Sequence, residues 1–505
     1  EFRRVLFRSS MALGSLVKTL QNIMRNDAGI NGDAQRIEQM TWLFFLKIYD
    51  AKEEEWEFHD DSYESIIPDR LRWHSWAPDA KDGSALTGDE LLDFVNNDLF
   101  KTLAGLELDQ NAPLRQVVVQ AAFTDANNYM KDGILLRQVV NAIDESVDFT
   151  EYKERHAFGE IYEIILKDLQ SAGNAGEFYT PRAVTDFMAE MLAPKLGESV
   201  ADFACGTGGF LTSALKLLAK QVNTPSDQEL YSKSIYGIEK KQLPYLLCIT
   251  NMLLHDIDNP QVFHDNSLEH DVRDYRHKEG GQFDVVLMNP PYGGSEKASI
   301  QNNFPTALRS SETADLFLAL ILYRLKKNGR VAVIIPDGFL FGQDAAKVEI
   351  KRRLLKDMNL HTVVRMPQSV FAPYTPITTN ILFFDNTGKS EGVWFYRMGM
   401  PEGYKHFSKT KPIKSEHFNE VREWWNDRKE IEEDGSPKAK FYSVEELNSD
   451  HNFDLCGYPH EEEEILPPDE LIRDYRQRRA ALDAEIDRKL AQICDILGIE
   501  DVDEG

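Results

Sequence analysis

Four consecutive residues carry groups suited to activating a planar amine: Asn289, Pro290, Pro291 and Tyr292. Proline has no N–H, so the carbonyl groups of Pro290 and Pro291 accept hydrogen bonds without a competing donor. With the Asn289 side-chain carbonyl, they can hold both hydrogens of an –NH2 group out of plane, which returns its delocalised lone pair to nitrogen. Tyr292 offers a flat face on which a planar ring can stack. We predict a site for a planar amine; the alternative is a simple Pro-Pro turn in a loop.

The run Phe283–Met288 must hold these groups in place. All but one of its residues are apolar, which is typical of a strand buried on both faces of a sheet. Because proline cannot donate to a ladder, Pro290 and Pro291 end the strand in a stiff turn. Asn289 therefore lies at the carboxyl end of a strand, where open α/β sheets bind their ligands.

A glycine-rich turn comes earlier in the chain. Residues 199–203 indicate a strand, and residues 206–209 form a turn that leads into a helical pattern. Glycine lets the backbone approach a ligand closely, although the spacing is neither that of G-x-G-x-x-G nor that of a P-loop. We predict a nucleoside site here, against the alternative of a turn without a ligand. The candidate residues are Asp202, Gly206, Thr207, Gly208 and Gly209.

Two later segments can complete the nucleoside site. The predicted strand 234–239 ends in Glu239, whose carboxylate is placed to accept hydrogen bonds from ribose hydroxyls. The segment 261–268 contains Asp265 and Asn266 and can close over an adenine ring.

A helix start lies ahead of the glycine turn. In the segment 176–182, Thr180 is predicted to be the N-cap and Pro181 the first helical residue. Such a cap often has no further role, but its free N–H groups can bind an anion such as a carboxylate.

The segments after Tyr292 continue the alternation of strands and helices. Strands are predicted at 329–336, 361–366 and 377–384, the last being the final strand, and helices at 316–325 and 349–360. This order predicts an α/β fold with a doubly wound sheet.

Two helical regions flank this core. Residues 13–169 have helical periodicity and are expected to pack on the next domain or on a partner. Residues 1–10 precede Met11 and are expected to be a cloning remnant. We therefore expect domains at 11–169, 170–400 and 401–505, the last with a helix at about 469–498.

Composition excludes several classes of protein. No apolar run approaches the roughly 18 residues of a membrane span, so no membrane partner is expected. The four cysteines have no metal-type spacing, which fits a reducing cytosol and predicts a cytoplasmic protein without a metal site. The net charge of -27 should repel DNA overall, so a partner would supply much of any DNA contact. Basic clusters occur at 326–330, 347–356 and 405–414, each either a solvated face or a phosphate groove.

The motifs together resemble a known family. D-F-A-C-G-T-G-G-F from Asp202, followed by N-P-P-Y from Asn289, is similar to amino-group methyltransferases that use S-adenosylmethionine. With G-E-F-Y-T-P-R from Gly176 and a long helical region ahead, the chain resembles the modification subunits of type I restriction-modification systems, which are N6-adenine DNA methyltransferases. The resemblance covers about residues 13–385 and a helical tail, and it implies a Rossmann-like core.

The resemblance implies a role for each motif by its position. The methionine end of the cofactor would be lined by Glu177, Phe178, Tyr179, Thr180, Pro181 and Arg182. Its amino acid and sugar would be held by Asp202, Gly206, Thr207, Gly208 and Gly209, with Glu239 on the ribose hydroxyls. The family usually has glycine where Asp265 stands, so either Asp265 or Asn266 would contact the adenine. The target base would bind at Asn289 to Tyr292, with Phe371 as a second stacking face or as a core residue.

The implied reaction is direct methyl transfer to adenine N6. The base must flip out, because N6 inside a duplex cannot reach the sulfonium methyl. Asn289 and the Pro290 carbonyl would accept the N6 hydrogens while nitrogen attacks in line, and neither a metal nor a strong base is needed. The alternatives are an amine methyltransferase acting on protein glutamine or RNA, or a non-catalytic assembly scaffold.

The segment after Asp385 has no evident element that reads base edges. From Asp469 a long amphipathic helix carries the stripe Leu482, Ile486 and Leu490, which is too isolated to bury itself. We expect it to dock on a separate DNA sequence-specificity subunit, although it can also fold back on its own core. The resemblance further implies double-stranded DNA, a second copy of this subunit and, in some systems, a restriction subunit as partners.

Overall fold

The computed structural model describes residues 16–79, 83–109, 112–146, 149, 162, 179–372, 375–458 and 468–497. The chain forms two compact units, Glu1–Gly457 and Tyr458–Gly505. Among the described helices, none combines the length and the apolar character that crossing a membrane requires.

The first part of the larger unit is helical, as predicted. Its helices are α2 (Asp33–His59), α3 (Trp73–Trp76), α4 (Gly88–Asp93), α5 (Phe100–Ala104), α6 (Leu114–Thr124) and α7 (Gly133–Ser146). This region also contains a helical stretch at residues 16–24, a 3-10 turn (Asp69–Leu71) and a π-helical segment (Phe94–Leu99). The aromatic residues of α2 form its core, and the Trp42 ring meets the Phe100 ring edge-on at 5.0 Å.

This helical region packs on helix α12 (Gln242–Leu254) of the next part of the chain, as expected. Lys52 of α2 is 1% exposed, and its ammonium group lies 3.3 Å from Asp256 and 2.9 Å from Asp258. Gln242, the first residue of α12, donates a hydrogen bond of 2.7 Å to the carbonyl of Ala121 in α6. The buried ammonium group of Lys52 and the hydrogen bond from Gln242 therefore hold the helical region against the following domain.

A mixed sheet of ten strands forms the centre of the larger unit. Its spatial order is β3-β2-β1-β4-β5-β7-β6-β8-β10-β9. β7 runs antiparallel between β5 and β6, and β10 runs antiparallel to β8 and β9, while the other pairings are parallel. The strands are β1 (Val200–Asp202), β2 (Ile235–Glu239), β3 (Val262–His264), β4 (Phe283–Met288), β5 (Leu325–Pro336), β6 (Asn359–Arg365), β7 (Thr379–Asp385), β8 (Gly392–Arg397), β9 (Ile431–Glu433) and β10 (Ser436–Ser443).

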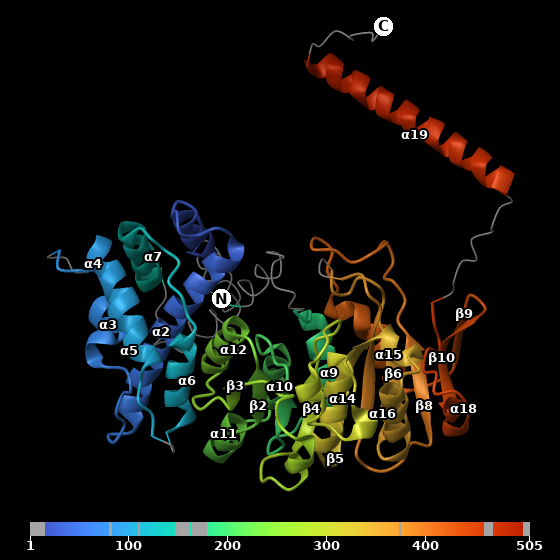
Figure 1. Ribbon diagram of the computed structural model, residues 1–505, viewed down its shortest axis with the longest axis horizontal. Coiled ribbons are helices and arrows are strands. Elements are labelled where there is room, and N and C mark those ends of the chain that lie inside the picture. The colour runs from blue at the N-terminus through green and yellow to red at the C-terminus, as the bar shows by residue number, and fades with distance from the viewer. Residues whose placement is uncertain are drawn as a thin grey trace. The chain divides into compact units, whose positions relative to one another are not determined.

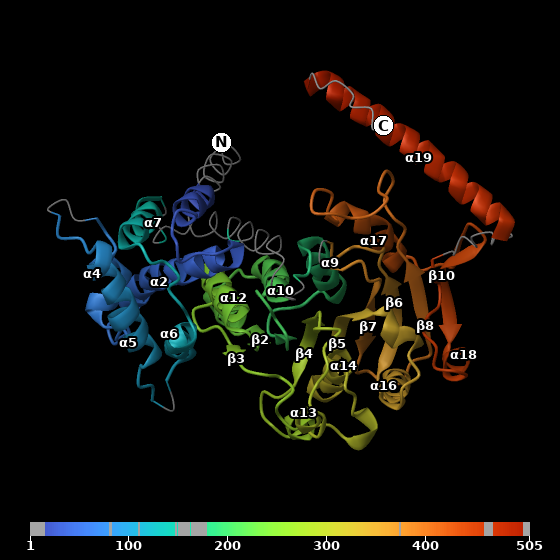
Figure 2. The ribbon, with the colours of Figure 1, turned by 45° about the horizontal axis from the view of Figure 1, so that its top comes forward.

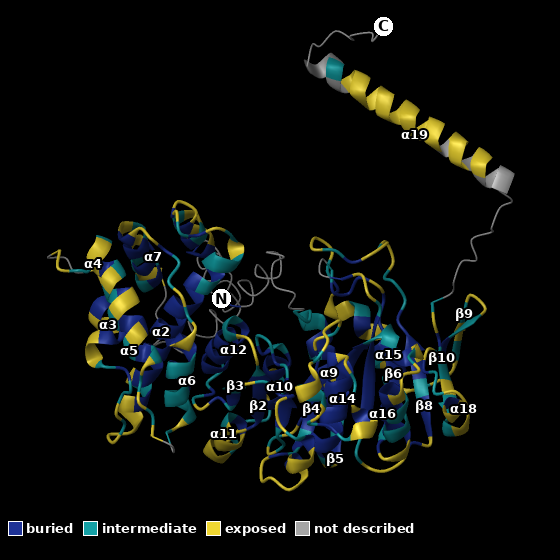
Figure 3. Cartoon of the chain, in the orientation of Figure 1, coloured by how far each residue is buried: buried dark blue, intermediate teal, exposed yellow. Residues whose placement is uncertain are grey.

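Helices cover both faces of this sheet (Figure 1 and Figure 2). The faces can be separated along β4, where Val285 and Leu287 belong to one apolar core while Val286 and Met288 belong to the other. The sheet is accordingly buried along its centre (Figure 3), so the predicted doubly wound α/β arrangement is confirmed. The first core contains α9 (Arg182–Leu192), α10 (Gly209–Ala219) and α12, and the second contains α14 (Thr313–Arg324) and α16 (Ala345–Lys356).

Short helices lie in the connections around this core. They are α11 (Pro225–Ser232), α13 (Ala298–Gln301), α15 (Asp337–Phe341), α17 (Asn419–Asn426) and α18 (Val444–Asn448).

Two sequence-based expectations for the sheet are wrong. The helix predicted to run to residue 360 ends at Lys356, because Asn359 and Leu360 pair with β7 as part of β6. The strand predicted as the last is followed by three more, of which β8 pairs in parallel with β6. The sheet thus continues to Ser443, and the domain boundaries expected from the sequence stay a prediction.

The second unit contains helix α19 (Pro468–Leu497), which begins within one residue of the predicted start. Its apolar stripe is exposed (Figure 3), with Leu482 at 60%, Ile486 at 54% and Leu490 at 53%. A helix with an exposed apolar stripe of this kind is suited to packing on another helical surface.

A buried carboxyl group lies inside the helical region. Glu53 of α2 is 0% exposed and accepts hydrogen bonds from the hydroxyls of Tyr63 at 2.8 Å and Ser65 at 2.6 Å. Burial raises the pKa of Glu53 to about 7, and the hydrogen bonds and the charge of Arg72 oppose that rise. Loss of the Glu53 proton therefore leaves a charge in the core of the helical region.

We expect Glu53→Gln to raise the unfolding temperature at about pH 8 and to leave it nearly unchanged at about pH 5. The folded pKa lies above the ordinary value of 4.5, so the stabilising effect of the proton is lost as the pH rises through about 7. The amide keeps both hydrogen bonds and removes a pH-dependent cost of about 3 kcal/mol at most. Calorimetry at the two pH values measures the effect.

The matched control is Glu54→Gln, because Glu54 is the exposed neighbour of Glu53 on the same helix. That control should follow the pH profile of the unsubstituted chain. Identical profiles for Glu53→Gln and the unsubstituted chain would contradict the assignment.

Candidate active site at the carboxyl edge of the sheet

Asn289 follows the last residue of β4 at the carboxyl edge of the parallel strands. Its side-chain nitrogen donates a hydrogen bond of 3.0 Å to the hydroxyl oxygen of Thr180. Its side-chain oxygen is buried and accepts no hydrogen bond from any described residue. A buried acceptor without a donor is costly, so this oxygen is suited to accept a hydrogen bond from a bound amine.

Thr180 does not cap a helix, so that prediction is wrong. Helix α9 begins at Arg182, Pro181 occupies the cap position, and the side chain at this position makes no capping hydrogen bond. The Thr180 hydroxyl instead accepts from Asn289, which lies 109 residues later in the chain. The first and the last of the three motifs are therefore joined directly.

The remaining residues of N-P-P-Y differ in their exposure. Pro290 is buried, Pro291 is exposed, and Tyr292 is partly buried. The pKa of the Tyr292 phenol is raised well above its usual value by burial, so the phenol stays protonated at neutral pH. A polar interaction with the Asn289 side chain opposes this rise in the Tyr292 pKa but does not cancel it, so Tyr292 is a neutral phenol at neutral pH.

The glycine turn after β1 is bound to the end of β2. The backbone N–H of Gly206 donates to one carboxylate oxygen of Glu239 at 2.9 Å, and the N–H of Lys241 donates to the other at 2.8 Å. Gly206 and Gly208 have φ angles of 53° and 82°, which favour glycine. A Cβ atom on Gly208 would lie 2.8 Å from the Cys248 sulfur, so the turn also requires glycine for packing.

Asp202 lies beneath this turn. It is 1% exposed and accepts a hydrogen bond of 3.1 Å from the N–H of Ala204. Burial raises the pKa of Asp202 to about 8, the Ala204 hydrogen bond opposes the rise, and the charge of Glu239 adds to it. Asp202 therefore favours its protonated form near neutral pH and can donate as well as accept a hydrogen bond.

The segment after β3 is hydrogen-bonded to Glu239, the last residue of β2. The N–H of Asp265 donates to the backbone carbonyl of Glu239 at 3.1 Å, and the Asp265 carboxylate contacts His270 at 2.8 Å. The Asn266 side chain accepts from the N–H of Leu268 at 3.2 Å and donates to Glu269 at 3.1 Å. The amide of Asn266 thus stabilises its own loop, whereas the carboxylate of Asp265 is exposed.

Arg182 links the first motif to the glycine turn. Its guanidinium donates a hydrogen bond of 2.6 Å to the carbonyl of Gly209 and lies 5.9 Å from the centre of the Tyr179 ring. Glu177 and Phe178, which were predicted beside the cofactor, lie outside the described residues. The described part of the motif is thus joined both to the glycine turn and to Asn289.

Phe371 has a different environment. It is 1% exposed and belongs to the apolar core, so its packing alone accounts for it. Its role in stacking on a base stays a prediction.

Sequence reasoning missed two contacts that hold the site together. The Ser267 hydroxyl donates to the carbonyl of Phe203 at 2.6 Å, which joins the loops after β3 and β1. The Asn251 side chain donates to the carbonyl of Thr207 at 3.4 Å and to the Thr212 hydroxyl at 3.1 Å. Ser267 lies in the segment 261–268, which the sequence analysis assigned to the nucleoside site. Nothing in the apolar sequence around Asn251 indicates that its side chain contacts the glycine turn.

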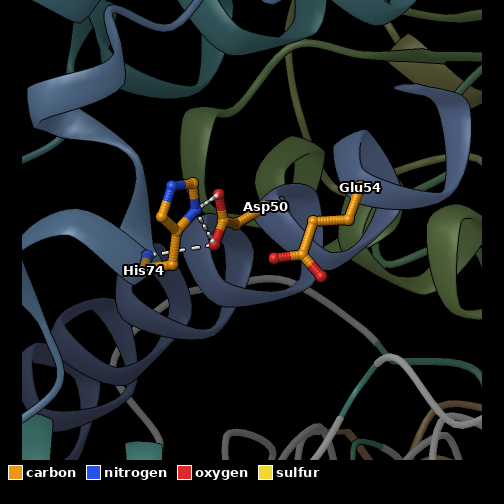
Figure 4. Close-up of side chains that lie close together, drawn as sticks. All are labelled: Asp50, Glu54 and His74. Atoms are coloured by element: carbon orange, nitrogen blue, oxygen red, sulfur yellow. Dashed lines mark hydrogen bonds and ion pairs between the residues drawn. The ribbon is translucent and has the colours of Figure 1, made fainter. Parts of the chain in front are cut away.

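One group among the described residues has metal-ligand composition, and it lies in the helical region. Asp50, Glu54 and His74 bring their ligand atoms close together (Figure 4). The Asp50 carboxylate is already used, because it accepts from the Arg72 guanidinium at 3.2 Å and contacts the His74 ring at 3.0 Å. The Arg72 cation opposes a metal ion there, so we assign none to this group.

Comparison with known proteins identifies the family to which the chain is similar. The family model for N-6 DNA Methylase matches residues 153–464, and the model for the HsdM N-terminal domain matches residues 13–143. The chain is 48% identical over 494 residues to the type I restriction enzyme EcoEI methylase subunit of Escherichia coli, with 97% of this chain and 98% of that protein covered. It is 27% identical over 407 residues to the EcoKI methylase subunit of Escherichia coli K12, with 76% and 70% covered.

Two solved structures are also similar. A modification subunit assigned to a type I restriction enzyme of Vibrio vulnificus YJ016 has 41% identity and a TM-score of 0.75, with 87% of this chain and 93% of that chain covered. A chain from a study of complex assembly in the type I R-M system has 34% identity and a TM-score of 0.78, with 97% and 99% covered. The expected Rossmann-like methyltransferase fold is thereby confirmed. Sequence and structure together show that the chain belongs to the N-6 DNA methylase family, among the modification subunits of type I restriction-modification systems.

Proposed function

We propose that the chain transfers a methyl group from S-adenosylmethionine to adenine N6 in double-stranded DNA. It does so as the modification subunit of a type I restriction-modification complex. The observation that carries the proposal is the Asn289 side chain, whose nitrogen is held by Thr180 while its buried oxygen is left to accept. Family membership supports the same activity, and the relatives reported above favour neither a scaffold nor an enzyme acting on protein or RNA.

The residues after β4 bind the target base through its amino group and its planar ring. Asn289 and the carbonyl of Pro290 would accept the two N6 hydrogens and so return the delocalised lone pair to the nitrogen. Tyr292 stacks on the flipped base, which returns ~1–3 kcal/mol of the few kcal/mol that unstacking costs. The two hydrogen bonds become stronger as positive charge develops on the nitrogen, so they favour the transition state over the bound substrate.

S-adenosylmethionine supplies an electrophilic methyl group when it is bound, and the residues of the glycine turn fit such a cofactor. Gly206, Gly208 and Gly209 present backbone without side chains, and Glu239 directs its carboxylate to the same turn. Glu239 would accept from ribose hydroxyls, and Asp202 would hold the sugar and amino acid portions. Tyr179 to Arg182 would line the methionine end, where the sequence also predicts Glu177 and Phe178, which lie outside the described residues.

Asp265 is the better candidate for the cofactor adenine. Both side chains make contacts within their own loop, but Asp265 is the more exposed of the two. Its carboxylate oxygens each have a second lone pair, with which they can accept from the adenine amino group. Phe371 would need to leave the core before it could stack on the base.

The partners follow from the relatives and from α19. The EcoEI protein is named as a methylase subunit of a type I restriction enzyme, and a similar chain comes from a study of complex assembly. We infer that this chain joins a DNA sequence-specificity subunit through the exposed stripe of α19. A second copy of the chain and, in a nuclease-active complex, a restriction subunit complete the assembly.

We expect Asn289→Ala to lower the methylation rate by about 10²–10³, as for the loss of one oriented hydrogen-bonding group from an active site. Thr180→Val removes only the bond that orients Asn289 and should lower the rate roughly 2- to 10-fold. Nucleoside mass spectrometry measures N6-methyladenine in a methylation-free host that carries the gene with its genomic neighbours. Normal turnover by a folded Asn289→Ala chain would show that its assigned role is wrong.

Glu239→Gln should bind S-adenosylmethionine about 10- to 100-fold more weakly, because hydrogen bonds to a charged group are lost. The amide also places an N–H group against one of the two backbone donors. Calorimetric titration of the full chain with the cofactor measures the change. The control is Glu229→Gln on α11, an exposed residue paired with Lys233. Equal affinities for the two variants would exclude Glu239 from the site.

The α19 stripe is tested by replacing Leu482, Ile486 and Leu490 together with Asp. The triple variant should lose co-purification with the specificity subunit and keep its affinity for S-adenosylmethionine, because three charges are placed in an apolar contact. The matched control carries Asp on the opposite face of α19, at Ala480, Ala484 and Ala491. Co-purification retained by the stripe variant, or lost equally by both, would reject the docking role.

A further inference from the structure

The segment between β8 and helix α17 has an unusual charge for this chain. Residues 403–414, here called the lysine segment, contain Lys405, Lys409, Lys411 and Lys414 and no Asp or Glu. The whole chain carries a net charge of -27, so four lysines within twelve residues, with no acidic residue among them, contrast with the chain as a whole.

Most basic residues of the other two clusters, 326–330 and 347–356, are paired with carboxylates within the fold. Lys347 is 3% exposed, and its ammonium group lies 2.7 Å from Glu312 and 3.1 Å from Asp315. Arg330 binds Glu198 at 2.8 Å. Lys326 is paired in the same way with Asp284, and Arg352 and Arg353 with Glu349. These basic residues therefore have little charge left for an external anion.

The lysine segment differs in this respect. All four of its lysines are exposed, and Lys405, Lys409 and Lys411 have no carboxylate within 4.0 Å among the residues that the structure describes. Lys414 contacts Glu416 at 3.3 Å, and both side chains are more than half exposed. An exposed pair of this kind contributes little, so its ammonium group can also exchange partners.

The segment is nevertheless held on a fixed base. The N–H of Phe407 donates to the Ser369 hydroxyl at 2.8 Å, and the Phe407 side chain is 2% exposed in the apolar core. Ser408 and Lys411 exchange two backbone hydrogen bonds of 3.1 Å, which form a tight turn with Lys409 at its tip. The lysines are thus presented from an ordered loop, and less entropy is lost when they bind.

The lysine segment stands at the same edge of the sheet as Asn289. β8 is parallel to β6, and both run in the direction of β4, so their carboxyl ends share one edge. Figure 1 and Figure 2 show the segment, in orange, rising beyond the ends of β6 and β8. Four strand spacings of ~4.8 Å separate β4 from β8, which is ~19 Å across the sheet. One DNA strand has a phosphate every ~3.4 Å, so this span corresponds to about six phosphates.

We propose that the lysine segment binds the phosphate backbone of the duplex, about six nucleotides from the adenine held at Asn289. The inference rests on the proposed function, since it places the DNA substrate on the edge that contains N-P-P-Y. The lysines act as point charges that release counterions, and they position the duplex without reading its sequence.

The test compares two quadruple variants of the full chain, each co-expressed and purified with the specificity subunit encoded by its genomic neighbour. One variant has Gln at Lys405, Lys409, Lys411 and Lys414. The control has Gln at four exposed lysines near the opposite edge of the sheet, which are Lys195, Lys216, Lys220 and Lys278. Fluorescence anisotropy with a labelled duplex of arbitrary sequence, at several salt concentrations, gives the affinity and its salt dependence.

The lysine-segment variant should bind the duplex at least roughly 10-fold more weakly near 0.1 M salt, with a salt slope smaller by about 0.9 for each lost phosphate contact. The control should match the unsubstituted complex, and all three should bind S-adenosylmethionine equally. Equal DNA affinity in both variants would overturn the proposal, as would a loss confined to cofactor binding. Failure of the proposed function is seen separately, as an absence of N6-methyladenine with the unsubstituted complex.

Discussion

The site depends on the point at which β4 stops pairing. Two prolines follow Met288 and Asn289, and a residue without an N–H cannot extend a ladder. The strand is buried on both faces up to that point, so its end is fixed by two apolar cores. Asn289 is therefore placed at the sheet edge by packing, and the hydrogen bond with Thr180 then fixes its amide. The remaining motifs are arranged around this edge by Arg182, Glu239 and their backbone partners.

Local sequence patterns predicted well the elements of this edge and, separately, helix α19 of the second unit. The apolar run ahead of Asn289 is a buried strand, the glycine turn joins a strand to a helix, and α19 begins where its amphipathic pattern begins. Each of these elements is marked in the sequence by a hydrophobic pattern within a few residues or by a residue type, such as glycine, that has a strong backbone preference. Thr180 shows the limit, because a threonine ahead of a proline indicates a cap, while its actual partner is 109 residues away. The pairing of β8 with β6 was missed for the same reason, since the place of a strand in a sheet is defined by a neighbour that is distant in the sequence.

Which charged groups are paired with one another could be predicted from the sequence even less than the pairing of the strands. From the sequence, three basic clusters had equal claims to a phosphate. In the fold, Lys347 and Arg330 are neutralised by carboxylates that come from distant segments. Only distances between charges distinguish such a cluster from the lysine segment. For an acidic chain, a few unneutralised lysines at one edge shape the local potential more than the net charge does.

The contact between α6 and α12 gives the helical region a mechanical connection to the cofactor site. Gln242 begins α12 and bonds to Ala121, while Lys241 just before it donates to Glu239. A displacement of the helical region that moved Gln242 would act through the adjacent Lys241 on the Glu239 carboxylate, which binds the glycine turn. Thermodynamic reciprocity then applies: an assembly partner that moves this region changes cofactor affinity, and cofactor binding changes the affinity for that partner by the same factor.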